Sequence, residues 1–434
     1  MAAVHRDVKL TDLANELILS ILEFCPDLVS LINATHAHPT IYHLFRAYRN
    51  HLATQALKNE LPEEVYTHAK VAFLAGQLTL KCPDNLSLDD IGDGVRKITE
   101  CRDRGSFFNL GIPSALSVSR LHRKVVDLAD VCLRECAETR EQNFAPLRDS
   151  LTTRLPSSTE RIRIHQAIYL FEILRSLCWE MHVERDRPRD YYVGYFMKLR
   201  ELHLTLTESA LAPWEMYQVI GIQAFFRRAL HGFGGLQPHF FFQVCGLLIR
   251  FAGRDEYHSE RVMPGFLSYG ISFLHKAICK TKSSERDDFL HRHEPGVLEY
   301  PIHALGAVLS RGARHTWTRK PLKPLDEYKP FWTGDTAGIR MWTRIEAKQL
   351  TLSTDDPQWV AMFDYELMRL EGRLDVWSAA LWDDDRWEDI EPTLRHPEPE
   401  CWDGIQHHCD PVDMGFHIAR SLEMAWMRNE SIEG

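Results

Sequence analysis

Long hydrophobic runs are missing from the 434-residue sequence. The most apolar stretch, residues 240–251, is interrupted by Gln243 and Arg250. It is also far shorter than the roughly 20 residues of a membrane span. The first ten residues, MAAVHRDVKL, lack the apolar core of a secretion signal. We therefore expect no membrane partner and a location in the cytoplasm, the nucleus or both.

An excess of positive charge is missing as well. The chain has 51 lysines and arginines against 61 aspartates and glutamates, which gives a formal net charge of −10. A protein that binds phosphate backbones normally presents a basic surface, because its affinity comes largely from neutralising phosphates. We therefore expect no nucleic-acid partner.

Cysteine pairs at the spacing of a zinc site are also missing. None of the ten cysteines belongs to a CxxC pair, and without an export signal we expect reduced thiols rather than a disulfide framework. Cys401, His407, His408 and Cys409 lie within nine residues and could offer soft ligands to zinc. However, the three adjacent side chains point in divergent directions. We predict no metal and no cofactor.

Motifs of catalysis are absent too. The sequence contains neither HExxH nor GxxxxGK[ST]. The glycine-rich stretch at 232–238 follows a predicted helix rather than a strand, and GFLSYG at 265–270 is not the GxSxG elbow. We therefore expect a non-catalytic protein, with an enzyme whose site is assembled from scattered residues as an open alternative.

Acidic residues and tryptophans cluster in the final third, most densely in WDDDRWED at 382–389. Three consecutive aspartates point around a helix rather than toward one cation, so we interpret them as an exposed acidic turn. The neighbouring Trp377, Trp382 and Trp387 are spaced five apart, and we expect them to anchor this segment in the helical body.

Helical periodicity is what the sequence does contain. Apolar residues recur at intervals of three and four along most of the chain, whereas alternation typical of strands is nearly absent. The clearest helix is predicted at 157–181, where Ser157 and Glu160 form a capping box and Phe171 lies on a buried face. We predict an all-α fold, with a short three-helix unit at 8–60 and a large irregular helical domain at 61–434.

The first predicted helix, LTDLANELILSILEF at 10–24, has more apolar surface than one core needs. At 100° per residue its apolar side chains cover about 180°, whereas a helix on a single core needs roughly 100°. Ile18 and Leu22 lie near one limit of this arc, and Leu13, Phe24 and Leu17 near the other. We expect one limit to face the chain's own core and the other a partner, unless the helical body covers both.

This opening segment resembles an F-box. Leu13-Ala14-Asn15-Glu16-Leu17 corresponds to the family's Leu-Pro-x-Glu-Leu, with Ala14 in place of proline, and Ile21-Leu22 corresponds to its apolar helix. Asp27-Leu28 and Leu31 match the second helix. The whole chain also resembles uncharacterised F-box-like proteins of filamentous fungi, through LINATHAHPTIYHLFRAYR, residues 160–169 and the Pro-Trp-Glu at 213–215.

The resemblance implies a substrate-recognition subunit of an SCF-type cullin-RING ubiquitin ligase. F-boxes dock on the Skp adaptor, while the rest of the chain captures a protein substrate. An F-box-derived scaffold outside any ligase is the alternative, consistent with Ala14. The residues expected to bind the adaptor are Leu10, Leu13, Ala14, Leu17, Ile18, Ile21, Leu22, Leu28 and Leu31.

Overall fold

A computed structural model of the chain describes twelve stretches of the sequence. They are residues 10, 13–81, 96, 110–138, 145–178, 211–231, 266–267, 269–280, 283–293, 338–340, 381–386 and 388. The elements along them are α1 (Asn15–Glu23), α2 (Leu28–Thr35), α3 (Pro39–Glu60), α4 (Glu63–Lys81), α6 (Ile112–Glu138), α7 (Ala145–Thr153), α8 (Ser158–Cys178), α10 (Pro213–His231), α12 (Ile271–His275), the π-helix η5 (Lys276–Lys280) and α13 (Ser283–Arg292).

The all-α fold class is confirmed. Across the described stretches the backbone is mostly helical and contains no strand. Helices α3 and α10 begin at Pro39 and Pro213, as expected for proline in a first helical turn. The sequence also predicts a loop at 81–94, a helix at 298–310, an extended segment at 320–330 and a last helix at 410–427. Lys81 is instead the last residue of α4, and the rest of these segments lies outside the described residues.

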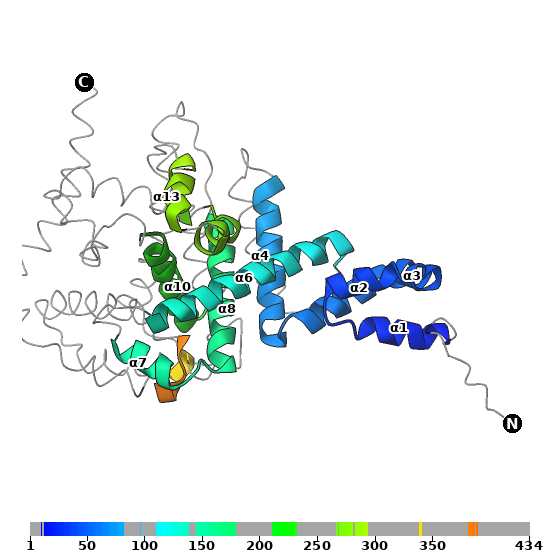
Figure 1. Cartoon of the computed structure of the whole chain (residues 1–434), viewed down its shortest axis with the longest axis horizontal. Helices are drawn as coiled ribbons and strands as arrows, with labels where there is room; N and C mark the ends of the chain where they lie inside the picture. The colour runs from blue at the N-terminus through cyan, green and yellow to red at the C-terminus, as the bar shows by residue number, and fades with distance from the viewer. Residues whose placement is uncertain are drawn as a thin grey trace, which may run out of the picture.

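Helix α8 is the centre of the helical body. It contacts α4, α6 and α10, and α6 crosses both α4 and α8 (Figure 1). All residues from Gln166 to Leu174 are buried, which is typical of a helix surrounded by other helices rather than lying on a surface. The predicted burial of this helix face is confirmed, because the side chains of Ile168, Phe171 and Leu174 are each at most 1% exposed.

The predicted capping box at the start of α8 is confirmed. The Ser157 N–H donates to Glu160 Oε2 at 2.9 Å, and the Glu160 N–H donates to Ser157 Oγ at 3.0 Å. These two bonds satisfy N–H groups that have no partner inside the helix. The sequence alone therefore located this helix start correctly.

The acidic turn docks on this helix start instead of standing free in solvent. Arg386 is 1% exposed, and its guanidinium donates to both carboxylate oxygens of Glu160, at 2.8 and 3.0 Å. Asp383 accepts a hydrogen bond from Ser157 at 2.5 Å and pairs with Arg163 at 2.8 Å. The exposed-turn interpretation is therefore wrong for Asp383 and Arg386. Each pairs with a buried charge of α8, Asp383 with Arg163 and Arg386 with Glu160, and a buried charge without a partner would be strongly destabilising.

Only one of the three predicted tryptophan anchors lies among the residues whose side chains are described. Trp382 is 3% exposed and belongs to the core, as expected. Trp377 and the side chain of Trp387 lie outside the described residues.

The N-terminal helices α1, α2 and α3 lie together at one end of the described structure (Figure 1). Helix α3 reaches from this end into the helical body, where Leu52, Ala53 and Leu57 are completely buried. Ser119 of α6 donates a hydrogen bond to Glu60, the last residue of α3, at 2.6 Å. Among the described helices, none is both long and apolar enough to cross a membrane.

His68 and His122 are buried between the helices of the body, and the neighbouring His165 is half-buried. His122 Nδ1 lies 2.9 Å from the Tyr169 hydroxyl, and the ring of His122 packs edge-on against that of His165, with centroids 5.9 Å apart. His68 Nδ1 lies 3.2 Å from the Glu64 carbonyl oxygen. Burial lowers the pKa of His68, His122 and His165 from 6.5 to about 4 because a charged imidazolium loses its hydration there.

These lowered pKa values predict an acid-sensitive fold. Between pH 6.5 and 4 the unfolded chain binds protons at these three sites whereas the folded chain does not, so stability falls as the pH falls. Each histidine contributes up to about 1.4 kcal/mol per pH unit in this range. Urea unfolding followed from pH 7.5 to 5 should show a steadily decreasing midpoint. A constant midpoint would mean that these histidines are not buried in the neutral form.

The burial of Phe171 predicts a large loss of stability when its ring is removed. The ring packs edge-on against that of Phe226, with centroids 5.1 Å apart, so Phe171→Ala should cost about 3–5 kcal/mol. Leu155→Ala is the control, because Leu155 is 84% exposed and the change should stay within about 0.5 kcal/mol. Chemical denaturation measures both. Equal midpoints for the two variants would place Phe171 outside the core.

Candidate partner-binding site

Three large apolar side chains lie on the outer face of α1 and its C-cap. Leu17, Ile21 and Phe24 are 54%, 45% and 83% exposed. Their spacing of four and three residues puts them on one face of the helix. We call these three residues the α1 stripe. Exposed apolar side chains scattered singly are common on protein surfaces, whereas a contiguous row of them is typical of an interaction site.

The opposite edge of α1 faces the chain's own core. Ile18 and Leu22 are 1% and 3% exposed, and α1 packs against α3. The C-terminal end of α1 is held by two further contacts. His51 Nε2 lies 2.8 Å from Glu23 Oε1, and the Asn59 side-chain amide donates to the carbonyl oxygens of Glu23 and Cys25 at 2.8 and 2.9 Å. The helix therefore presents the stripe from a fixed position.

The structure divides the predicted site residues into two groups. Leu10, Ala14, Leu17 and Ile21 are exposed, and Leu13 is half-buried. In contrast, the side chains of Ile18, Leu22, Leu28 and Leu31 belong to the core and are at most 3% exposed. These four contribute to the site by holding α1 and α2 in place, and the surface open to a partner consists of the others.

Phe24 was not among the predicted site residues although it is the most exposed large apolar side chain of α1. The helical wheel places it between Leu13 and Leu17 in the apolar arc. The F-box motif assigns it no position, and for that reason the resemblance did not identify it. The position of Phe24 in the apolar arc was the one feature of the sequence that indicated a role in the site.

Asp27 is the N-cap residue of α2. The Ser30 N–H donates to Asp27 Oδ1 at 2.7 Å, and this bond holds the pKa of the Asp27 carboxyl below its usual range. Helix α1 has no such cap, since Ala14 occupies the N-cap position and offers no side-chain acceptor. The N-terminal end of α2 is therefore stabilised by a side-chain cap, and that of α1 is not.

The prediction that Cys401, His407, His408 and Cys409 hold no metal cannot be tested, because these residues lie outside the described residues. Within the described stretches no three His, Cys, Asp or Glu side chains are grouped so that they could hold a metal ion.

Comparison with known proteins gave no significant match to this chain, whether to protein-family profiles, to curated proteins or to solved structures.

The backbone conformation of Ala14 indicates that the folded chain can accommodate proline at this position. Its φ of −61° matches the value that proline imposes, and its N–H donates no hydrogen bond to another described residue. Ala14→Pro should therefore leave stability unchanged or raise it by about 0.4–1 kcal/mol by restricting the unfolded chain. Ser20→Pro, in the interior of the same helix, should cost about 3 kcal/mol. Urea unfolding of both variants makes the comparison, and an equal loss would contradict the assigned start of α1.

Proposed function

We propose that this protein is a substrate-recognition subunit of an SCF-type cullin-RING ubiquitin ligase, and that it binds the Skp adaptor through the α1 stripe. The observation that carries the proposal is the two-sided character of α1, with Ile18 and Leu22 in the core and the stripe in solvent. The resemblance of residues 13–31 to an F-box names the partner.

The physical driving force for this binding is the burial of the stripe. Covering apolar surface contributes roughly 25 cal/mol per Å² removed from water. Large aromatic and aliphatic side chains near the centre of an interface commonly account for most of the binding energy. Phe24, with 83% of its surface exposed, has the most surface to lose.

In this function the chain transfers nothing itself. The adaptor side connects it to the ligase, and the remaining helical body captures a protein substrate. Because one chain holds both the ligase and the substrate, the effective concentration of substrate lysines near the charged ubiquitin carrier is raised. A location in the cytoplasm or nucleus, where ubiquitin ligases act, belongs to the same proposal.

A scaffold that uses the same stripe outside a ligase is the second candidate. Its support is Ala14 at the position of the family's proline, which removes a side chain that F-boxes use against the adaptor. In this case α1 binds another protein, and the Skp adaptor does not bind.

The decisive experiment measures the affinity of the purified full chain for the Skp adaptor. Wild type should bind at micromolar concentrations or tighter. Leu17→Asp/Ile21→Asp should weaken binding by at least about 100-fold, since each aspartate places an unpaired charge in the interface. The melting temperature should change less than in a core variant, because about half of each side chain is exposed to water in the free protein.

Two controls make the result specific. Leu155→Asp introduces the same charge at an exposed leucine far from α1 in the sequence, and it should bind like wild type. Ile18→Asp/Leu22→Asp should instead lower the melting temperature, because both side chains are in the core. If wild type and Ala14→Pro both fail to bind the adaptor at micromolar concentrations, the ligase function is wrong and the scaffold takes its place.

A further inference from the structure

Helix α3 is bent in its middle. Tyr48 has φ −113° and ψ 19°, outside the helical range, within a helix that otherwise runs from Pro39 to Glu60. Sharp bends usually coincide with proline or glycine, yet residues 40–60 contain neither. The bend opens a pocket of about 530 Å³ that is lined by the consecutive residues 46–51. Non-helical residues of this kind cluster at ligand-binding positions in proteins.

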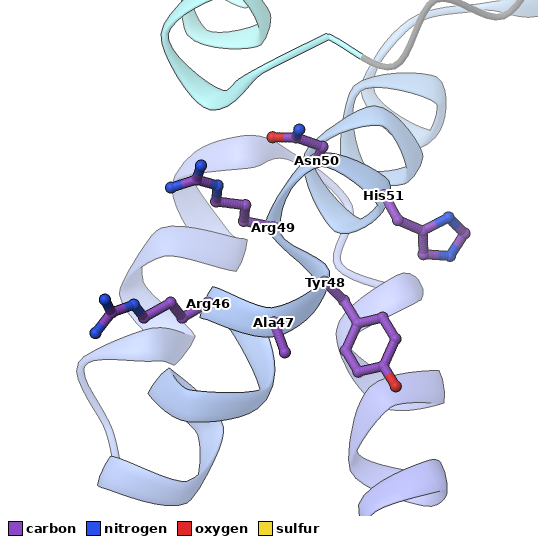
Figure 2. Close-up of a pocket in the computed structure, with 6 residues that line it drawn as sticks. All are labelled: Arg46, Ala47, Tyr48, Arg49, Asn50 and His51. Carbon is purple, nitrogen blue, oxygen red and sulfur yellow. The ribbon is translucent and has the colours of Figure 1, made fainter.

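Two arginines line this pocket and point to the same side. Figure 2 shows the side chains of Arg46 and Arg49 extending together, while Tyr48 and His51 extend to the opposite side. Both arginines are exposed, and neither forms an ion pair or hydrogen bond with another described residue. Because both guanidinium groups extend to the same side of the bend (Figure 2), their charges act together on a ligand there.

The sequence segment that forms this pocket has no acidic residue of its own, and the carboxylate of Glu23 contacts the pocket residue His51, which extends away from the two arginines (Figure 2). From Leu28 to Asn59 there is no aspartate or glutamate, whereas three lysines or arginines and four histidines occur. The chain as a whole has a formal net charge of −10, so this segment stands out as a positive region. No carboxylate of the segment itself can neutralise the two arginines.

We propose that the pocket at the bend of α3 binds an acidic peptide segment of a protein partner. The arginine guanidinium matches carboxylates with two parallel N–H donors, and Asn50 adds a neutral donor at the rim of the pocket. A nucleic acid fits less well, because affinity for its backbone comes from neutralising phosphates with a basic surface, and the chain has a formal net charge of −10. The proposal concerns a different surface from the α1 stripe and does not depend on the Skp adaptor.

A labelled hexaglutamate peptide is the probe for this pocket. Its binding to the full-length chain is followed by fluorescence anisotropy in 50 mM salt, with hexalysine as the negative probe. Wild type should bind hexaglutamate and not hexalysine. Arg46→Gln/Arg49→Gln should weaken hexaglutamate binding at least about tenfold. The single variant Arg49→Gln, expected to lose at least about threefold, replaces the double variant if the latter melts below wild type.

The matched control removes the same charge from another exposed surface. Arg120 and Arg134 of α6 are exposed, and Arg120→Gln/Arg134→Gln should change hexaglutamate binding by no more than about twofold. Three results would overturn the proposal. They are no binding of hexaglutamate to wild type, equal losses in the two double variants, and tighter binding of a ten-nucleotide single-stranded RNA that depends on Arg46 and Arg49.

Discussion

The burial of α8 on all sides is the constraint on which the described structure depends. A helix with no solvent-facing side over nine consecutive residues, Gln166 to Leu174, must have every polar group on it satisfied by a neighbour. Gln166 donates to the Glu64 carbonyl oxygen of α4 at 3.0 Å, and Glu172 accepts a hydrogen bond from the Ile271 N–H of α12 at 2.9 Å. At the start of the helix, Arg386 neutralises Glu160. Each of these contacts fixes another segment against α8.

Helix α1 is in the opposite situation, and this contrast supports its proposed function. Helix α1 packs against α3 through the buried side chains of Ile18 and Leu22. No described element covers Leu17, Ile21 and Phe24. In a body whose central helix is buried on all sides from Gln166 to Leu174, an uncovered apolar row is a departure that a binding partner would explain. The contacts of Glu23 with His51 and Asn59 hold the row in place before any partner arrives.

Local patterns were predictable from the sequence, whereas contacts between distant segments were not. The capping box at Ser157 and the proline at the start of α3 depend on neighbours within three residues, so the sequence displays them directly. The pairing of Glu160 with Arg386 joins residues 226 positions apart, and no local pattern encodes it. The bend at Tyr48 also lacks a local cause such as proline.

The candidate site shows the same division. The helical wheel of α1 predicted both limits of the apolar arc, but only packing against α3 determines that Ile18 and Leu22 face inward. For the same reason Leu28 and Leu31, which the motif assigned to the adaptor, turned out to be core residues. A family motif records which residues recur, and it does not separate those that touch the partner from those that position them.

Hydrogen exchange of the full-length chain, alone and with the Skp adaptor, tests the central claim most directly. If the adaptor covers the outer face of α1, the backbone amides of residues 15–24 should exchange more slowly in the complex, because binding suppresses local opening of this helix. The amides of α8 should exchange at the same rate in both samples. Unchanged exchange in residues 15–24 at saturating adaptor would contradict the account.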